Sequence, residues 1–354
     1  MDEFQIGERL VGLCHPPFIV AEMSGNHKGS LQRALEIVDK AKQSGAHAIK
    51  LQTYTAETIT LDMREKEFLI QDDSSLWNHR YLYDLYQEAY TPWEWHRPIF
   101  EYSKKIGLEV FSSPFDETAV DFLEDLNPPC YKIASPEIVD HHLIRKVAKT
   151  RKPLILSTGG ATLAEIGEAV DVARGAGCRH ILLLKCTAAY PAEPQDIHLR
   201  TLPHLAQSFG LLTGLSDHTL GIGVAIASVA LGACLIEKHL TLSRKDGGID
   251  SPFSMEPEEL QALVSESKKA WESMGAIHYG PLSREKSTLS HRPSIYFIEN
   301  LCAGTILEMQ HVVTVRPAGG LPPKELPHIL GLTLTTSVKK GSPVRWELFK
   351  NDAY

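Results

Sequence analysis

From Pro17 to Trp271 the chain alternates short apolar runs with amphipathic helical segments, and this alternation limits the possible folds more than any other feature. We predict strands at Phe18–Met23, Ala48–Thr53, Glu109–Ser113, Tyr131–Ala134, Leu154–Ser157, Ile181–Cys186, Leu212–Ser216 and Cys234–His239. Eight strand–helix units over roughly 250 residues is the usual size of an α/β TIM (β/α)8 barrel. A doubly wound open sheet is the alternative, but it usually carries a GxGxxG turn, which this sequence lacks.

Nearly every predicted strand ends in a polar side chain. In a TIM barrel the carboxyl ends of the strands form the face that carries the active site. Side chains alternate along a strand, so Glu22 with Ser24, and Lys50 with Gln52, should point the same way. The other polar residues at strand ends are Ser112, Ser113, Lys132, Ser135, Ser157, Thr158, Lys185, Thr187, His218 and His239. Their placing supports the barrel more strongly than the number of strands does.

One strand–helix–strand unit, from Gly214 to Leu242, closes each of its two strands with a histidine, His218 and His239. Both strand ends of a parallel unit emerge on the same side of the sheet, so the two imidazoles can converge. Converging neutral imidazoles with a carboxylate nearby are typical ligands of a divalent metal. Two histidines in a chain that holds 16 can also be structural or solvated.

Two lysines, Lys50 and Lys132, are predicted to lie inside the barrel, where an unpaired ammonium group is costly. One interpretation pairs each lysine with a barrel carboxylate such as Glu22 or Glu237. The other treats the lysines and the neighbouring hydroxyl groups as a cradle for a phosphate or carboxylate. We favour the cradle because these groups cluster at the strand ends.

Two loops are unusual for a barrel. Tyr54–Tyr90 is far longer than an ordinary loop between strand and helix and is rich in charges and aromatic residues, which predicts a lid or a rim over the site. Ser243–Phe253 carries glycines that allow close backbone approach, and its Asp246 and Asp250 offer acceptors for sugar hydroxyls. A solvated turn is the alternative for this second loop.

After Gly280 the pattern changes to short strands and turns, which predicts a second, β-rich domain of about seventy residues. We expect a catalytic domain over residues 1–280, a linker over 281–290 and the small domain over 291–354. The predicted strands of the small domain are Ser294–Ile298, Val312–Val315 and Leu332–Val338. Few residues are left for a core, so this domain should pack on another surface.

Arg316 stands at the base of a loop, RPAGGLPP, whose prolines stiffen a turn and whose glycines let it approach a ligand. Its planar fork of donors suits an amide or a carboxylate. A surface arginine beside a solvated turn is an equal alternative on these residues alone.

Composition narrows the setting in which the protein works. The net charge of −8 and the pI near 6.1 argue against a nucleic-acid surface. No apolar run approaches about twenty residues, and the first residues are polar, so we expect neither a membrane span nor a signal peptide. The six cysteines are scattered without CxxC spacing, which favours a reduced, cytoplasmic protein.

Motifs along nearly the whole chain carry a family resemblance. They read FIVAEMSGNHKGSLQRALEIV, AIKLQTYT, FSSPFDETAVDFLE, YKIAS, LSTGGATLAEI, LSDHTLGIGVAIASVALGA, IEKHLTL and VRPAGGLPPK. Together they resemble the sialic acid synthase family, whose members join phosphoenolpyruvate to an acetamido-sugar and release phosphate. The C-terminal part is similar to the small β-rich antifreeze-like (SAF-type) domain of these enzymes.

Three segments, Tyr90–His96, Asp73–Trp77 and Asp246–Ser254, are most similar to the pseudaminic acid branch of the family. The resemblance therefore implies that phosphoenolpyruvate is condensed with a diacetamido-deoxyhexose, 2,4-diacetamido-2,4,6-trideoxy-β-L-altropyranose, in its open-chain form. The nearest alternatives keep the chemistry and change the sugar, giving N-acetylneuraminate or legionaminate.

The resemblance also implies roles for individual residues and a domain-swapped homodimer. His218 and His239 would hold a divalent metal, Mn²⁺ or Mg²⁺, with Glu22 beside it as a catalytic group. The residues that would bind phosphoenolpyruvate are Lys50, Ser113, Lys132, Ser135 and Ser157. Those that would face the sugar are Gln52, Tyr190 and Asp250, together with Arg316 from the partner subunit.

The sequence departs from the family pattern at three places. Ala188 stands where the family often has a serine or asparagine that contacts phosphate, which puts one phosphate contact in doubt. Gly160 replaces a usual methionine, and residues 291–294 replace an RRS-type segment.

Two function classes compete with the synthase. In a Schiff-base aldolase a barrel lysine would attack the keto acid covalently, and borohydride trapping with pyruvate would reveal it. A non-catalytic carbohydrate-binding protein is suggested only by the antifreeze-like tail, and the polar barrel face argues against it.

Overall fold

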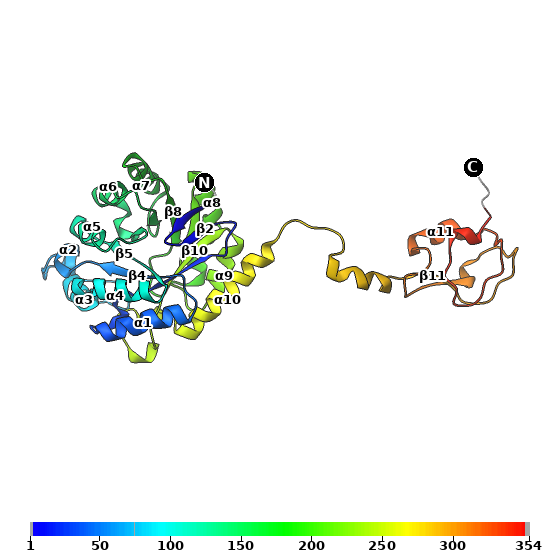
Figure 1. The fold of residues 1–354 in the computed structure, drawn as a ribbon, viewed down its shortest axis with the longest axis horizontal. Helices are drawn as coiled ribbons and strands as arrows, with labels where there is room; N and C mark the ends of the chain where they lie inside the picture. The colour runs from blue at the N-terminus through cyan, green and yellow to red at the C-terminus, as the bar shows by residue number, and fades with distance from the viewer. Residues whose placement is uncertain (1–2, 74, 351–354) are drawn as a thin grey trace. The chain divides into compact units, whose positions relative to one another are not determined.

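The computed structural model describes residues 3–73 and 75–350 and confirms the predicted barrel (Figure 1). Eight parallel strands follow one another around the barrel in chain order, and the last pairs with the first. They are β3 (Phe18–Glu22), β4 (Ala48–Thr53), β5 (Glu109–Pro114), β6 (Tyr131–Ile133), β7 (Leu154–Ser157), β8 (Ile181–Cys186), β9 (Leu212–Ser216) and β10 (Ala233–His239). Each lies within two residues of its predicted position.

Helices cover the outside of the barrel. They are α1 (Leu31–Gln43), α4 (Trp93–Lys105), α5 (Glu117–Glu124), α6 (His141–Lys149), α7 (Leu163–Gly175), α8 (Thr201–Phe209), α9 (Gly223–Ala230) and α10 (Pro257–Met274). Helix α1 shows why they form: Ile37, Val38 and Ala41 recur at helical spacing and are fully buried. Ser30 caps the helix by accepting a hydrogen bond from the backbone of Arg33. The resulting outer core lies between the helices and the strands.

A second apolar cluster fills the inside of the barrel at the amino ends of the strands. A hairpin of β1 (Glu3–Ile6) and β2 (Arg9–Gly12) contributes Phe4 and Val11 to this cluster. The sequence analysis did not predict the hairpin. With that end of the barrel filled by apolar side chains, the polar residues inside the barrel gather at the carboxyl ends of the strands.

The long segment between β4 and α4 is structured. It contains α2 (Ala56–Ile59), a 3-10 turn η2 (Lys66–Phe68) and α3 (Leu82–Ala89). Tyr54, at its start, is 2% exposed and packs edge-on against Tyr86 of α3 and against Phe115. The segment is therefore anchored at the end of the barrel where β4 finishes, as a rim over the site requires.

The chain divides into two compact units, Met1–Gly275 and Ala276–Tyr354. Within the second, a 3-10 helix η7 (Ser283–His291) covers most of the predicted linker. Strands β11 (Ser294–Phe297) and β12 (Val312–Val315) form an antiparallel pair, and α11 (Leu326–Ile329) follows. The described part of this domain ends at residue 350, so the last residues of the predicted 291–354 domain lie outside it.

One strand prediction in the small domain is wrong. Leu332–Val338 forms no continuous strand and makes only isolated bridges, through Thr333, Leu334 and Val338. Their partners belong to different parts of the chain, near residues 301, 306 and 349, so no single neighbour offers a continuous ladder. Leu334 is nevertheless buried in the core of the domain, which explains the apolar pattern.

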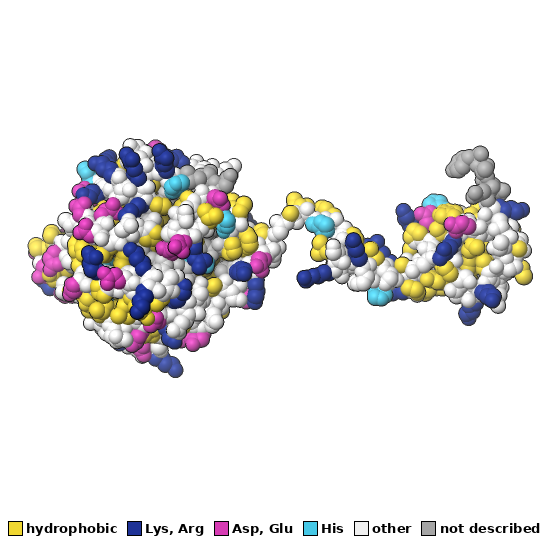
Figure 2. All heavy atoms as spheres, in the orientation of Figure 1, with side chains coloured by type: hydrophobic (Ala, Val, Ile, Leu, Met, Phe, Trp, Pro, Cys, Tyr) yellow, Lys and Arg dark blue, Asp and Glu magenta, His cyan; other side chains and the backbone are white. Residues whose placement is uncertain are grey.

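The distribution of charged side chains on the surface is that of an ordinary globular protein. On the face shown in Figure 2, basic and acidic side chains are interspersed over the barrel unit rather than gathered by sign. Among the described residues no helix is long and apolar enough to cross a membrane.

Candidate active site

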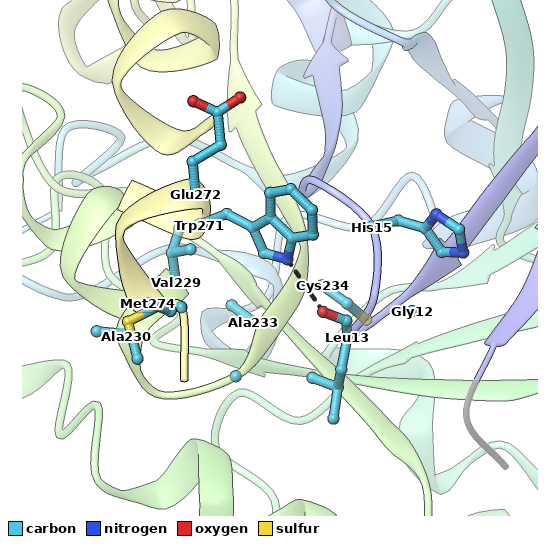
Figure 3. Close-up of a pocket in the computed structure, with 12 residues that line it drawn as sticks. Gly12, Leu13, His15, Val229, Ala230, Ala233, Cys234, Trp271, Glu272 and Met274 are labelled. Carbon is cyan, nitrogen blue, oxygen red and sulfur yellow. Dashed lines mark hydrogen bonds between the residues drawn. The ribbon is translucent and has the colours of Figure 1, made fainter. Parts of the chain in front are cut away.

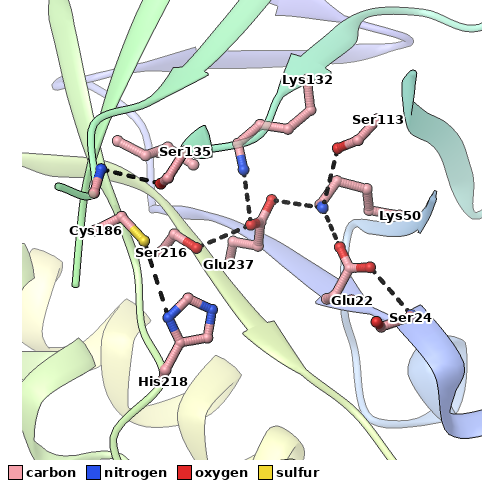
Figure 4. Close-up of polar contacts among 12 residues, drawn as sticks. Glu22, Ser24, Lys50, Ser113, Lys132, Ser135, Cys186, Ser216, His218 and Glu237 are labelled. Carbon is pink, nitrogen blue, oxygen red and sulfur yellow. Dashed lines mark hydrogen bonds and ion pairs between the residues drawn. The ribbon is translucent and has the colours of Figure 1, made fainter. Parts of the chain in front are cut away.

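Four charged side chains meet inside the barrel at the carboxyl ends of its strands (Figure 4). Glu22 closes β3, Lys50 lies in β4, Lys132 in β6 and Glu237 in β10. Alternation along each strand turns them inward. Two residues earlier in their strands, Val20, Ala48 and Leu235 belong to the apolar cluster inside the barrel. All four charged residues are at most 5% exposed.

Ion pairs join the four charges in a chain. Lys50 Nζ contacts Glu22 Oε2 and lies 3.8 Å from Glu237 Oε2, and Lys132 Nζ lies 3.0 Å from Glu237 Oε1. Ser216 Oγ donates a hydrogen bond of 3.0 Å to Glu237 Oε1. Each lysine is therefore paired with a barrel carboxylate, as one of the two interpretations of the sequence predicts. The same lysines remain available to an anion that competes for them.

The two carboxyl groups differ in electrostatic setting. Burial raises the pKa of Glu22, and the ammonium group of Lys50 offsets part of that rise. Burial acts in the same direction on Glu237, but Lys132 and Lys50 outweigh it and lower the pKa of Glu237 to about 2. Glu237 is consequently a fixed anion, whereas Glu22 is the carboxyl group better suited to take up and release a proton.

Hydroxyl groups lie around the lysines. Ser113 Oγ is 3.4 Å from Lys50 Nζ, and Ser135 Oγ accepts a hydrogen bond of 3.0 Å from the backbone of Gly159. Ser157 Oγ is buried and finds no hydrogen-bond partner among the described residues. An unsatisfied buried hydroxyl costs about 1–3 kcal/mol. Such a group inside a polar pocket is suited to a ligand that completes its hydrogen bonds.

The two histidines converge as the sequence predicts. The ring centroids of His218 and His239 are 5.3 Å apart. His218 Nδ1 lies 3.1 Å from the carbonyl oxygen of Thr187, so a proton on Nδ1 leaves Nε2 with a free lone pair. Burial, followed by the nearby charges, holds the pKa of His239 well below its ordinary value, so this imidazole is neutral.

Burial lowers the pKa of His218, but Cys186 and the carbonyl oxygen of Thr187 outweigh this effect and raise that pKa, so His239 is the imidazole that is held neutral. Few acidic groups join the two rings. Among the described residues no group of three or more histidine, cysteine, aspartate or glutamate side chains is arranged to hold a metal. Glu22 lies opposite His239 in the strand register without forming such a group with it. Any ion bound here would have positions left for water or substrate, as catalytic metal sites do.

An aromatic wall stands against the histidines. The ring of Tyr190 lies 4.5 Å from that of His218, and the ring of Phe253 lies 4.9 Å from that of His239. Trp77, from the predicted lid, packs 5.5 Å from Tyr190 and donates from its indole to the carbonyl of Ile249 at 3.3 Å. The lid and the loop after β10 therefore meet beside the histidines. Ser74, within the DSSLW segment, lies outside the described residues.

The two aspartates of the loop after β10 differ. Asp250 is 5% exposed, and its Oδ2 accepts a hydrogen bond of 3.2 Å from the backbone of Gly25. Burial raises the pKa of Asp250. Asp246 instead accepts a hydrogen bond of 2.8 Å from Arg33, so its carboxylate is already engaged. Of the two, Asp250 is the more buried carboxylate.

Other predicted residues are more loosely tied to the cluster. Gln52 is half-buried and lies opposite Ser113 in the register of β4 and β5. Ala188 is exposed. Arg316 belongs to the second compact unit, at the end of β12, and its side chain is exposed.

Sequence reasoning did not count Glu137, Trp77 and Phe253 among the site residues, and it named Glu237 only as a possible partner of the lysines. Glu237 carried a signal, because it precedes His239 by two residues and must therefore face the same way. Phe253 and Trp77 lie in irregular loops, where the sequence has no helical or strand periodicity from which the direction of a side chain could be predicted. Glu137 follows β6 in a short 3-10 turn, and its Oε2 is buried without a hydrogen-bond partner among the described residues.

Replacing Glu137 by glutamine is expected to stabilise the protein at alkaline pH, on the order of 1–3 kcal/mol. Burial raises the pKa of Glu137 from 4.5 to about 7. Between these values the folded protein keeps a proton that the unfolded chain has lost, so rising pH lowers wild-type stability. Urea unfolding of both proteins between about pH 5 and 8 should show their difference growing with pH. A difference in stability that does not change with pH would contradict the raised pKa of Glu137.

A cavity at the other end of the barrel is separate from this cluster. It measures about 500 Å³ and is lined by Leu13, Ala233, Trp271 and Met274 among others (Figure 3). The indole of Trp271 donates to the carbonyl of Leu13 at 3.0 Å. The cavity adjoins the start of β10, at the amino ends of the strands, where TIM barrels carry stability rather than catalysis.

Comparison with known proteins identifies the family of this chain. The profile of the NeuB family matches residues 37–279, and that of the SAF domain matches residues 292–350. A pseudaminic acid synthase of Helicobacter pylori is 41% identical over 94% of this chain and 97% of its own. An N,N'-diacetyllegionaminic acid synthase of Legionella pneumophila is 35% identical over 93% of this chain and 94% of its own.

A solved structure agrees with both the fold and the family. An N-acetylneuraminic acid synthetase of Leptospira borgpetersenii, crystallised with citrate, aligns with a TM-score of 0.72 at 31% identity. The alignment covers 81% of this chain and 95% of the other.

Proposed function

Because the chain belongs to the NeuB family, and is therefore a phosphoenolpyruvate-dependent nonulosonic acid synthase, we propose that it makes pseudaminic acid. Its sugar substrate would be 2,4-diacetamido-2,4,6-trideoxy-β-L-altropyranose, reacting as the open-chain aldehyde. The observation that carries the reaction is the meeting of two lysines, two carboxylates and two histidines at one end of the barrel. The likeness to pseudaminic acid synthases supports the choice of sugar.

Phosphoenolpyruvate would bind where the lysines lie. Its phosphate and carboxylate carry the charge that Lys50 and Lys132 can balance, and charge-assisted hydrogen bonds of this kind are strong. Ser113, Ser135 and Ser157 offer hydroxyl groups, and Ser157 Oγ makes no hydrogen bond within the described residues. Binding would draw the lysines partly away from Glu22 and Glu237. Ala188, with no polar side chain, leaves this cradle without the contact that a serine or asparagine would add.

The carbon–carbon bond forms between C3 of phosphoenolpyruvate and C1 of the aldehyde, whose oxygen becomes a hydroxyl after taking up a proton. C2 is left with cationic character, which the carboxylate of Glu22 is suited to stabilise. Water adds at C2 and passes a proton to Glu22, whose raised pKa fits a general base. The C2–O bond to phosphate then breaks, and phosphate leaves with its oxygen and with the proton that the C2 hydroxyl loses as it becomes a ketone. Glu22 returns its proton to the alkoxide formed from the aldehyde, which restores the carboxylate.

Family members generally depend on a metal. In this chain His218 and His239 would hold it, as Mn²⁺ or Mg²⁺, because both rings are buried beside the pocket and His239 Nδ1 has no hydrogen-bond partner among the described residues. When bound, the ion supplies Lewis-acid polarisation of the aldehyde oxygen.

The sugar would lie against Tyr190 and its neighbouring rings. This wall is apolar and suits the methyl group of a 6-deoxy sugar. Gln52 and Asp250 would hydrogen-bond the sugar's hydroxyl and amide groups. Asp250 is already fixed in place by Gly25.

Arg316 would complete the sugar site from a second subunit. The small domain leaves apolar side chains uncovered: Ile306, Val315 and Trp346 are 58%, 41% and 42% exposed. Apolar side chains are also visible on the face of this domain in Figure 2. Such a surface favours packing against another subunit, in a homodimer where each small domain would cap the partner's barrel.

We expect the 6-deoxy diacetamido-altrose to exceed N-acetylmannosamine in kcat/KM by about 10–200-fold. An apolar wall favours the methyl group and leaves a 6-hydroxyl without a partner. Phosphate release from phosphoenolpyruvate, measured across the candidate sugars, tests this. A higher kcat/KM for N-acetylmannosamine, or for the diacetamido precursor of legionaminic acid, would replace the proposed sugar and leave the reaction intact.

A further inference from the structure

A second buried ion pair joins the two residues that precede His218 and His239, Asp217 and Lys238. Lys238 Nζ is 2.8 Å from Asp217 Oδ2 and donates to the carbonyl of Thr219 at 2.7 Å. Both charged side chains are at most 1% exposed. Asp217 Oδ1 also accepts from the backbone and the hydroxyl of Thr219, at 2.9 and 2.8 Å. Each charged residue immediately precedes one of the histidines in sequence.

This pair lies outside the reaction pocket. Glu237 and His239 face the inside of the barrel, so alternation turns Lys238 outward. Ile236 and Leu240, on the same side of the strand, belong to the core between barrel and helices. None of the steps of the reaction uses Asp217 or Lys238.

A buried ion pair is weak evidence for stability, because apolar side chains of similar size usually serve as well or better. Such pairs are better known for holding neighbouring segments in a single conformation. Here the ion pair links the residues that follow β9 to the end of β10. The backbone of Asp217 donates to the carbonyl of Glu237 at 2.9 Å, which adds a second tie at the same point.

We propose that the pair of Asp217 and Lys238 positions His218 and His239 relative to each other, and so sets the affinity of the site for a divalent ion. The inference rests on the proposed metal role of the two histidines. It makes Asp217 and Lys238 positioning residues, since neither reaches the ligand. Partners that orient metal ligands typically change affinity by about 10–100-fold when replaced.

The test is the double variant Asp217→Asn, Lys238→Met. It removes both charges together, so no unpaired charge stays buried, and asparagine can still accept from Thr219. We expect Tm close to that of the wild type but Mn²⁺ binding weaker by about 10–100-fold, measured by the electron paramagnetic resonance of Mn²⁺ without substrate. A control pair, Asp121→Asn with Lys146→Met, removes a surface ion pair of 2.6 Å and should leave the affinity unchanged.

The possible results separate this inference from the proposed function. Wild-type Mn²⁺ affinity in the double variant, together with loss of binding in His239→Ala, would overturn the positioning role alone. Binding that His239→Ala leaves unchanged would overturn the metal role and the inference with it. If the double variant does not fold, Asp217→Asn with Lys238→Gln decides, because it also leaves no charge buried and keeps side chains that can hydrogen-bond Thr219. It should weaken Mn²⁺ binding by about tenfold or more, and unchanged binding would overturn the inference.

Discussion

His239→Ala is expected to lower kcat by about 10³-fold or more while the barrel stays folded. A Lewis acid contributes several kcal/mol to stabilising the developing charge, and each 1.4 kcal/mol corresponds to about a tenfold change in rate. His239 Nδ1 makes no hydrogen bond within the described residues, so its loss leaves no partner there unsatisfied. His218→Ala should be as inactive but less stable, because it also loses the contact with Thr187. Phosphate release and thermal unfolding measure the two effects.

Metal removal provides the companion measurement. Chelation should abolish wild-type turnover, and added Mn²⁺ or Mg²⁺ should restore it, whereas His239→Ala should respond to neither. His47→Ala is a matched control at the other end of the barrel, where His47 Nδ1 accepts from the backbone of Ile19 at 2.9 Å. It should lose stability and keep chelator-sensitive activity. Full wild-type activity after exhaustive chelation would contradict the metal role.

The barrel was predictable because buried strands and surface helices leave different periods in the sequence. Ala48–Thr53 and Leu212–Ser216 have the predicted bounds in the structure. The hairpin at Glu3–Gly12 was missed because its short strands, EFQI and RLVG, carry polar and charged residues, whereas the equally short β7, LILS, is a nearly continuous apolar run. Leu332–Val338 gave the opposite error, since burial against several short segments produces the same apolar pattern as a strand.

The site was predictable as a set of residues but less so as a set of contacts. Strand ends in a barrel point to one face, so Lys50, Lys132 and the histidines could be grouped from sequence. Which lysine pairs with which carboxylate depends on strand register and barrel closure. Glu237 lies between both lysines only because β10 closes the barrel against β3. The direction of Trp77 depends on a long loop, and no sequence period fixes it.

Two inactive variants are expected to restore activity when they are expressed together. Glu22→Gln removes the proposed base but keeps a side chain that can accept from the backbone of Ser24, as Glu22 does at 3.1 Å. Arg316→Ala removes the proposed sugar contact from an exposed position and should leave the fold unchanged. Each variant alone should be nearly inactive, because every site then lacks one of the two groups.

In a domain-swapped heterodimer of these variants, the barrel of the Arg316→Ala chain keeps Glu22 and receives Arg316 from its partner. If the two chains pair at random, half of the dimers are heterodimers, and each heterodimer has one complete site out of two. About a quarter of wild-type activity should therefore return. Expressing Glu22→Gln with the double variant Glu22→Gln, Arg316→Ala is the matched control, since none of its sites contains Glu22. If purified heterodimers show no activity, Arg316 acts over its own barrel, because that arrangement leaves both sites of the mixed dimer incomplete. Full activity of Arg316→Ala alone would instead place Arg316 outside the site.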